Sequence, residues 1–535
     1  MSRNRMTHVF SQVPSAKIPR ASFDRSHGHK TTFDAGYLIP IFVDEALPGD
    51  TFNLSMTGFG RLATPIFPIM DNVYLDSFFF AVPIRLVWDN WQKFNGEQKN
   101  PGDSTDFVTP QVVAPAVTGW PLGSMSDFMG IPTGIPGLPV SAFWHRAYNL
   151  IWNEWFRDQN LQDSLPVPTG NGPDLPTDYA LQRRGKRHDY FTSCLPWPQK
   201  GPAVSIPLGT SAPVSGIFAV NSGTPEPGNE GYLAVSGSAL DPNNMVKVVG
   251  DPTFAPVNPS ALYASFRQVD GTGLFADLSQ ATAATINSLR QAFQIQKIYE
   301  RDARGGTRYT ELIRSHFGVT SPDARLQRPE YLGGGSSPIN IHPVVQTSPT
   351  GTYASTPQGN VSAFGTALAR NHGFSMSFTE HCVIIGLVCV RADLNYQQGL
   401  NRMWSRRTRF DYYWPALSHI GEQAVLRKEI YATGVPTDND LVFGYQERYA
   451  EYRYKPNVIT NLFRSSAPQS LDTWHLAQEF ANAPTLSPEF IVENPPMDRI
   501  LAVPTEPDII FDAYFRMRCV RPMPIYGVPG LIDHF

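Results

Sequence analysis

The sequence is poor in charged residues. Asp, Glu, Lys and Arg make up 17% of its 535 residues, whereas ordinary soluble domains carry roughly 25%. A monomer must solvate its whole exterior, so a charge-poor chain with 12% aromatic residues is expected to bury much surface against partners. The formal net charge of −4 excludes a polycation, so any nucleic-acid binding has to be local.

Cysteine is also scarce. The chain has no CxxC motif, and Cys382 and Cys389 lie an odd seven residues apart in an expected strand, so they should face opposite sides. This pattern predicts neither a disulfide framework nor a zinc site, and a reducing cytoplasm is the natural setting for assembly. The four cysteines are Cys194, Cys382, Cys389 and Cys519.

Targeting segments and catalytic signatures are not found. The N-terminus MSRNRMTHVF lacks the apolar core of a signal peptide, and the apolar run VIIGLVCV (383–390) is too short to span a bilayer. The sequence contains no HExxH, no GxSxG, no Walker GxxxxGK[ST] and no GxGxxG between a strand and a helix. We therefore expect no enzymatic activity, no cofactor and no metal site.

Turn-forming residues, in contrast, are abundant. Proline and glycine number 48 and 42, about a sixth of the chain. Because disordered chains are poor in aromatic residues, this combination predicts ordered protein with long loops. A length of 535 residues predicts two or three units, or one unit with large insertions.

The stretch DNVYLDSFFFAVPIRLVW (71–88) is the centre of the predicted fold. Alternate residues of a strand point to opposite faces, and here both sets are apolar: Leu75 and Phe79 on one face, Phe80 and Val82 on the other. This predicts a strand covered on both faces. A buried amphipathic helix is the alternative. Pro83 and the FFF run favour the strand, because proline and adjacent aromatic residues are poor helix formers.

Further strands follow one another across short turns, which predicts an antiparallel sandwich or barrel. They are expected at residues 35–47, 51–63, 373–378, 382–393, 426–434, 441–454 and 509–520.

Three helices are expected between the early and late strands. Residues 141–156 have a helical aromatic stripe (Trp144, Tyr148, Ile151, Trp155), with Ser141 as the cap. A long helix should begin at Ser279 and end at Gly305, and a shorter one should stop at Gly318.

Residues 1–30 are predicted to form a basic N-terminal arm rather than packed structure. The hypothesis is that its bases contact phosphates; the alternative is a solvated tail. His27-Gly-His29 resembles a metal motif, but without a third ligand it is more often solvated. The six candidate nucleic-acid-binding residues are Arg3, Arg5, Lys17, Arg20, Arg25 and Lys30.

Residues 201–275 differ from the rest: turn clusters separate short β-like runs, and only two bases occur. We interpret them as a β-rich protruding insertion, because 75 residues are too many for an unstructured loop in a compact protein. The insertion divides the predicted jelly roll into 31–200 and 276–535. Another segment, GYQERYAEYRYK (444–455), mixes tyrosines with bases as single-strand binders do, although this is also ordinary strand composition.

Several long motifs resemble the major capsid protein of the microviruses, small tailless bacteriophages with circular single-stranded DNA, and their gokushovirus branch in particular. The motifs are SQVPSAKIPRASFDRSHGHKTTFDAGYLIPIFVDEALPGD (11–50), RLQRPEYLGG (325–334), FGYQERYAEYRYKPNVITNLFRS (443–465), SLDTWHLAQEF (470–480) and RPMPIYGVPGLIDHF (521–535). The resemblance covers both ends and most of the chain and is weakest in 201–275.

The resemblance implies a mainly β fold, a single eight-stranded antiparallel jelly roll with long loop insertions and several helices. It also implies a structural protein of the virion, about sixty copies of which close a T=1 icosahedral shell around the genome. The insertion would form threefold protrusions that attach to a host receptor. Implied partners are an internal scaffolding protein, a DNA pilot protein and a small basic DNA-binding protein. The alternative function is a β-sandwich carbohydrate-binding or carbohydrate-active protein.

Overall fold

The computed structural model describes residues 19–201, 286–319, 327–348 and 358–526, together with five short strands within 202–285. The chain forms two units, one of Met1–Lys200 with Arg301–Phe535 and one of Gly201–Glu300. The second unit includes residues 201–275, for which the protruding insertion stays a prediction.

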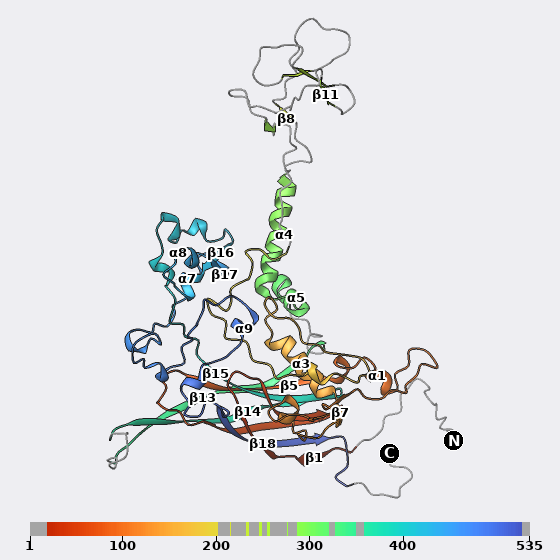
Figure 1. Cartoon of the computed structure of the whole chain (residues 1–535). Helices are drawn as coiled ribbons and strands as arrows, with labels where there is room; N and C mark the ends of the chain where they lie inside the picture. The colour runs from red at the N-terminus through yellow and green to blue at the C-terminus, as the bar shows by residue number, and fades with distance from the viewer. Residues whose placement is uncertain are drawn as a thin grey trace, which may run out of the picture. The chain divides into compact units, whose positions relative to one another are not determined.

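The first unit contains a curled antiparallel sheet (Figure 1). Its order is β1-β18-β4-β14-β13-β5-β15-β3, with β2 also on β18. Because β1 and β2 pair with successive parts of the same edge of β18, the strands fill eight positions. The predicted jelly roll is thereby confirmed. The strands are β1 (Ala21–Asp24), β2 (His27–Phe33), β3 (Ile39–Ala46), β4 (Thr51–Leu62), β5 (Val73–Pro83), β13 (Glu330–Val345), β14 (Val361–Ser377), β15 (Cys382–Ala392) and β18 (Ile509–Arg521).

Strand β13 joins the two layers of the sandwich. Its first part, from Glu330 to Ile339, pairs with β5, and its second part, from Asn340 to Val345, pairs with β14. The glycines of the first part permit a close approach of neighbouring strands: a Cβ at Gly333 would lie 2.4 Å from the carbonyl oxygen of Gly373. One layer is thus β3-β15-β5-β13, and the other is β13-β14-β4-β18 with β1 and β2.

Strand β5 is covered on both faces, as the sequence predicted. Leu75 and Phe79 lie in the core between the two layers. Phe80 and Val82 point the opposite way, into a second core under the loop segments. The same alternation separates Cys382 from Cys389 on β15, which confirms that they face opposite sides; all four cysteines are free and buried.

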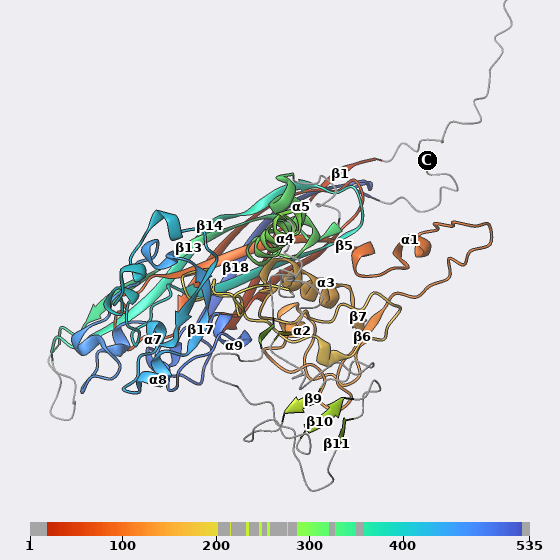
Figure 2. The same cartoon turned by 90° about the horizontal axis from the view of Figure 1, so that it is seen from above.

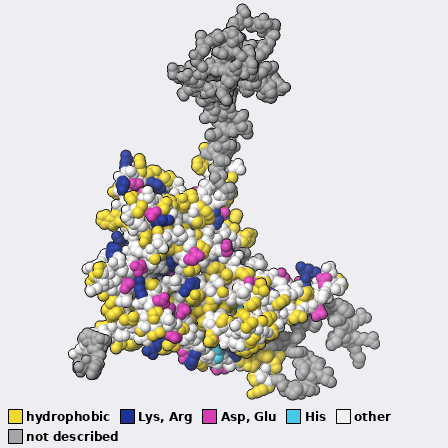
Figure 3. All heavy atoms as spheres, in the orientation of Figure 1, with side chains coloured by type: hydrophobic (Ala, Val, Ile, Leu, Met, Phe, Trp, Pro, Cys, Tyr) yellow, Lys and Arg dark blue, Asp and Glu magenta, His cyan; other side chains and the backbone are white. Residues whose placement is uncertain are grey.

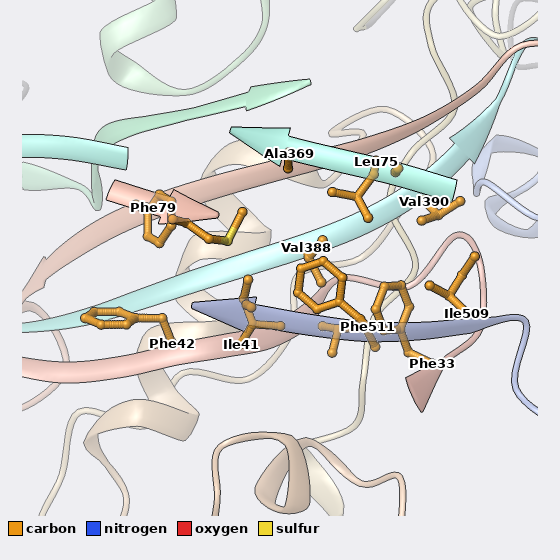
Figure 4. Packing of buried hydrophobic residues seen from close by; sticks show 14 of the residues in the cluster. Phe33, Ile41, Phe42, Leu75, Phe79, Ala369, Val388, Val390, Ile509 and Phe511 are labelled. Atoms are coloured by element: carbon orange, nitrogen blue, oxygen red, sulfur yellow. The ribbon is translucent and has the colours of Figure 1, made fainter. Parts of the chain in front are cut away.

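The inner core is built from the side chains of the two layers that point toward each other (Figure 4). Phe79 contacts the ring of Phe42 on β3 at 6.2 Å and that of Phe374 on β14 at 5.6 Å between centroids. Phe33 on β2 meets Phe511 on β18 edge to face at 6.0 Å. Aromatic residues from both layers therefore hold the sandwich together.

The outer core lies between β5, β15 and a helix-bearing loop segment. This segment contains α1 (Trp91–Phe94), β6 (Gln111–Val113), α2 (Met125–Phe128), β7 (Pro139–Ser141), α3 (Phe143–Ile151) and a π-helical turn (Trp152–Phe156). Tyr148 and Ile151 of the predicted aromatic stripe are buried there. The stripe is thus a packing face at Tyr148 and Ile151, whereas Trp155 is 38% exposed.

The predicted cap of this helix is wrong. Ser141 pairs with Gln111 in the β6–β7 ladder, so the chain enters the helix one residue later, with Ala142 at the N-cap and no side-chain cap. The Ser141 Oγ accepts only a long hydrogen bond, 3.5 Å, from the amide of Phe143.

Helix α3 also carries a fully buried ion pair. The Arg146 guanidinium donates to both carboxylate oxygens of Asp174, at 2.7 and 2.6 Å, and to the carbonyl oxygens of Val87 and Gly170. Tyr179 donates its hydroxyl to the same carboxylate at 2.5 Å. The network ties α3 to two loop segments.

A separate lobe of the first unit is formed by residues between β15 and β18 (Figure 2). It contains β16 (Glu422–Leu426), α7 (Arg427–Ile430), α8 (Pro436–Asn439), β17 (Val442–Glu447) and α9 (Pro488–Ile491). The strand predicted at 426–434 is wrong: the Glu429 carboxylate accepts from the amide of Leu426 and turns the backbone into α7. The strand predicted at 441–454 ends at Glu447.

The second unit has two small sheets, β11-β10-β9 and β12-β8. Their strands are β8 (Val214–Ser215), β9 (Tyr232–Ala234), β10 (Met245–Val248), β11 (Phe254–Pro256) and β12 (Phe275–Ala276).

Helix α4 (Ile286–Gly305) ends where predicted, and the cap expected at Ser279 lies outside the described residues. Helix α5 (Tyr309–Phe317) ends at Gly318, which adopts φ 70°.

Candidate nucleic-acid interface and subunit contact surface

The structure divides the six predicted arm bases into two groups. Arg3, Arg5 and Lys17 lie outside the described residues. The other three make contacts within the fold: Arg20 donates to the carbonyl oxygen of Gly49, Arg25 to the Asp44 carboxylate at 2.6 and 3.0 Å, and Lys30 pairs with Asp512 at 2.7 Å.

The expectation of an unpacked arm over residues 1–30 is therefore corrected. Residues 21–24 and 27–33 are the edge strands β1 and β2, because their backbones complete the hydrogen-bonding edge of β18. Only the residues before β1 can form a free arm.

The outer surface of the β18–β4–β14 layer is the stronger candidate for a nucleic-acid interface. Along β18 buried and exposed residues alternate, and the exposed parity points away from the inner core. No other element of the part of the chain that the structure describes covers this surface, whereas α3 and its neighbours lie over the opposite layer (Figure 1). We call it the open sheet face. Its exposed bases and large apolar residues are Arg516, Arg518, Ile510 and Tyr514 of β18, Arg61 and Phe59 of β4, and Arg370, Phe364 and Leu368 of β14.

The strand register brings these side chains together. Phe59 lies between Asp512 and Leu368 on the two neighbouring strands, and Arg61 lies opposite Ile510. Arginine and aromatic side chains are thus interleaved across three strands. Such surfaces bind single strands, because bases stack on the rings while the cations contact the phosphates.

The open sheet face carries excess positive charge. Its acids are Asp24, on β1, and Asp512, whose carboxylate forms an ion pair with Lys30. Hydrogen bonds from Ser26, and then the charges of Arg518 and Arg516, lower the pKa of Asp24. Within the described chain, Arg61, Arg370 and Arg516 make no ion pair.

Sequence reasoning missed this surface, although a signal was present. In IIFDAYFRMRCV the bases Arg516 and Arg518 alternate with Phe515, Met517 and Cys519, which are buried. The alternation places both arginines on the same face of the strand, and the structure shows that this face is uncovered. The sequence does not show which of the two layers is uncovered.

The other candidate motifs have structural roles. His27 packs against the ring of Phe515 at 5.2 Å, and burial, followed by the charge of His27, lowers the pKa of His29. Among the described residues, no group of His, Cys, Asp or Glu has the geometry to hold a metal ion. In 444–455, Tyr449 is buried and Tyr454 stacks on Tyr190 at 5.5 Å, so these two rings serve packing, whereas Tyr452 is 48% exposed.

A second surface has the composition of a subunit contact. Residues 403–414, which we call the aromatic segment, expose five large aromatic side chains, and Trp404 is 72% exposed. Arg409 lies over the Trp414 ring at 4.6 Å, and Arg406 over the Tyr452 ring at 4.1 Å. Trp, Tyr and Arg are the residues most enriched where interfaces are strongest. The exposed aromatic residues are Trp404, Phe410, Tyr412, Tyr413 and Trp414.

The wider surface agrees with this composition. Apolar side chains cover much of the visible face of the first unit, with charged ones scattered between them (Figure 3). Among the described helices, none is long and apolar enough to cross a membrane. An apolar exterior of this extent is expected to be covered by other protein molecules.

A jelly roll with long insertions, an open basic sheet face and an exposed aromatic segment is the architecture expected of a viral capsid subunit. The comparisons agree: the profile of the phage family "Capsid protein (F protein)" matches residues 11–531, and the chain belongs to this family. It is 49% identical to capsid protein VP1 of Bdellovibrio phage phiMH2K, over 99% of this chain and 98% of the relative. It is 45% identical to VP1 of Chlamydia phage 1, over 98% of both chains, and 40% identical to VP1 of Spiroplasma virus 4, over 99% and 98%.

These matches confirm the microvirus resemblance and its gokushovirus character. The chain is a phage capsid protein, a structural component of the virion. The family membership decides against the carbohydrate-binding alternative.

Proposed function

We propose that this chain assembles, in about sixty copies, into a T=1 icosahedral shell around a circular single-stranded DNA genome, with the open sheet face toward the DNA. The observation that carries the proposal is the interleaving of arginines with exposed aromatic rings on the layer that no other described element covers. We propose that Arg3, Arg5 and Lys17, which precede β1 in the sequence, also contact the DNA. The role is structural and not catalytic.

The DNA contact is tested by removing charge from the open sheet face. Arg370→Gln combined with Arg516→Gln should lower the affinity of the subunit for single-stranded DNA. The slope of log K against log salt should fall by about 0.7 for each phosphate that the variant no longer neutralises. The measurement is fluorescence anisotropy with a labelled oligonucleotide across a salt series.

Arg453→Gln is the control for the loss of a surface charge, since Arg453 is 66% exposed, lies outside the open sheet face and pairs with Glu447 at 2.6 Å. It should leave affinity and slope unchanged. A deletion of residues 2–18, which spares β1, should lower the slope independently. If the Arg370/Arg516 variant binds DNA with wild-type affinity and slope, the open sheet face is not the DNA interface.

We propose that the aromatic segment contacts a neighbouring copy in the shell. Trp404→Ala should leave the unfolding temperature of the free subunit unchanged, because the ring is mostly exposed, and should reduce the yield of closed particles by about tenfold or more, as for the removal of an interface hot spot. Sedimentation separates subunits from shells. Tyr309→Ala, at a 77% exposed ring on α5, is the control. Full particle yield from the Trp404 variant would contradict this assignment.

We propose further that residues 201–275 form threefold protrusions for attachment to a host receptor. The proposal is supported by the separate second unit and by the low charge and turn-rich composition of the segment. Replacing residues 205–275 with a Gly/Ser linker should leave subunit folding intact and abolish adsorption to host cells. Particles that lack the segment and still adsorb at the normal rate would exclude it as the attachment element.

The remaining partners are proposed from the family resemblance. They are an internal scaffolding protein, a DNA pilot protein and a small basic DNA-binding protein, and assembly would take place in the host bacterial cytoplasm. The basic partner would offset the subunit's net charge of −4 next to packaged phosphate.

A further inference from the structure

A cavity of about 570 Å³ lies on the outer side of the β5–β15–β13 layer, opposite the open sheet face. All of its lining residues belong to the first unit. They come from β5, β13, β15, the π-helical turn and the two residues after it, the loop at 184–188, the residue before α5 and the end of α9. We call it the arginine cavity. Its volume is in the range of small-ligand sites.

Three arginines of the arginine cavity have more N–H donors than there are acceptor atoms around them. Arg184 and Arg391 share one oxygen of the buried Asp76, at 2.5 and 2.8 Å. Arg157 donates one nitrogen to the Gln162 carbonyl oxygen at 3.0 Å, and its Nε is buried with no hydrogen-bond partner among the described residues. Because a guanidinium has five N–H donors, most donors of these three groups are left over.

The two other arginines of the wall are paired with carboxylates, and Lys186 bonds to a neutral side-chain amide. Arg308 bonds to Glu311 at 2.9 Å, Arg187 reaches Asp393 at 3.4 Å, and the Lys186 ammonium bonds to the Gln478 side chain at 3.0 Å. The one acid that lines the cavity, Asp158, accepts from the amides of Asn160 and Leu161. Arg157, Arg184 and Arg391 therefore hold most of the guanidinium donors without an acceptor, and the Nε of Arg308 also lacks a hydrogen-bond partner among the described residues.

Burial and neighbouring cations disfavour the charged form of two of these arginines. Burial, and next the charge of Arg184, lowers the pKa of Arg391. Burial, and next the charge of Arg308, lowers the pKa of Arg157. An anion in the cavity would offset the repulsion between these cations.

The floor of the arginine cavity is aromatic. Phe80 meets the rings of Phe156 and Tyr331 edge to face at 6.0 and 5.6 Å. Tyr331 and Trp155, 6.0 Å apart, are 43% and 38% exposed, so both rings keep open surface, and the Arg328 guanidinium already lies over part of the Trp155 ring at 4.7 Å. Open ring surface next to guanidinium groups suits a ligand that combines a flat ring with a phosphate.

We propose that the arginine cavity binds a nucleotide, with the phosphate ester at Arg157, Arg184 and Arg391 and the base against Trp155 and Tyr331. This site goes beyond the proposed function, because it lies on the opposite layer from the open sheet face. A free nucleotide and one unit of a DNA strand offer the same chemistry. An acidic peptide would use only the cations and leave the rings unused.

The test is calorimetric titration of the full-length soluble subunit with deoxyadenosine monophosphate, and in parallel with deoxyadenosine. We expect the monophosphate to bind at least about tenfold more tightly, because the nucleoside cannot form the charge-assisted bonds to the phosphate. Arg157→Gln should weaken monophosphate binding by about tenfold, and Tyr331→Leu should weaken both ligands. Arg453→Gln should change neither.

Thermal unfolding of each variant shows whether it is folded. If the Arg157 variant does not fold, Tyr331→Leu still tests the site, because this ring is half exposed and its replacement should not unfold the subunit. Competition by a short single-stranded oligonucleotide would identify the strand as the source, and its failure to compete would identify the free nucleotide. Equal affinity for nucleotide and nucleoside, unchanged binding by folded Arg157→Gln, or tighter binding of an Asp/Phe peptide than of the monophosphate would overturn the proposal.

Discussion

Phe79→Ala is expected to lower the free energy of unfolding of the subunit by about 3–5 kcal/mol, the usual cost of truncating a buried phenylalanine. Phe79 is 0% exposed and lies between the two layers, against Phe42 and Phe374. The site is closely packed, since even a Cβ at Gly386 would lie 2.7 Å from the Phe79 ring. The surrounding strands are paired on both sides and cannot collapse into the void.

Urea unfolding of the soluble subunit measures this decrease. Because native proteins are stable by only about 5–15 kcal/mol, soluble subunit should be depleted before shells form. Phe59→Ala is the matched control: its ring is 47% exposed on the open sheet face, and the change in unfolding free energy should be small, within about 1 kcal/mol. Equal decreases for the two variants would mean that the inner core is not centred on β5.

Asp174→Asn is expected to cost about 3–5 kcal/mol of unfolding free energy, because it leaves the buried Arg146 cation without a counter-charge. The two side chains are 0% and 2% exposed, so no water replaces the missing carboxylate. The carbonyl oxygens of Val87 and Gly170 still accept from the guanidinium but carry no net charge.

Two variants separate this effect from the ordinary removal of an ion pair. Asp512→Asn removes the partner of Lys30 in an exposed pair, 78% and 53% accessible, and should change stability by less than about 1 kcal/mol. Arg146→Met with Asp174→Leu removes both buried charges and should be more stable than Asp174→Asn alone. If the double variant is the less stable of the two, the isolated charge is not the cause.

The sequence by itself determined the elements whose pattern is strong and local. The two apolar parities of 73–83 required a strand covered on both sides, and the odd spacing of Cys382 and Cys389 placed them on opposite faces of β15. Gly305 and Gly318 marked the ends of α4 and α5. These features depend on backbone geometry and side-chain periodicity within a few residues, so they can be predicted without tertiary contacts.

Long motifs allowed a further step, because the capsid family was identified from stretches at both ends of the chain, and the profile match over residues 11–531 confirmed it. Membership of this family implies the jelly-roll fold. Composition alone had left a carbohydrate-binding sandwich as an alternative.

Only the tertiary structure decided which surfaces are open and which charges are free. Residues 21–33 have a polar, basic composition typical of a tail, yet they fold as edge strands because β18 offers an unpaired backbone edge. Ser141 pairs with Gln111 in a ladder instead of capping the helix, and Glu429 turned a predicted strand into a helix. The open sheet face and the arginine cavity each combine residues that are more than a hundred positions apart in the sequence. Such sites depend on strand register and on which layer is covered, and both are set by long-range pairing that local periodicity does not encode.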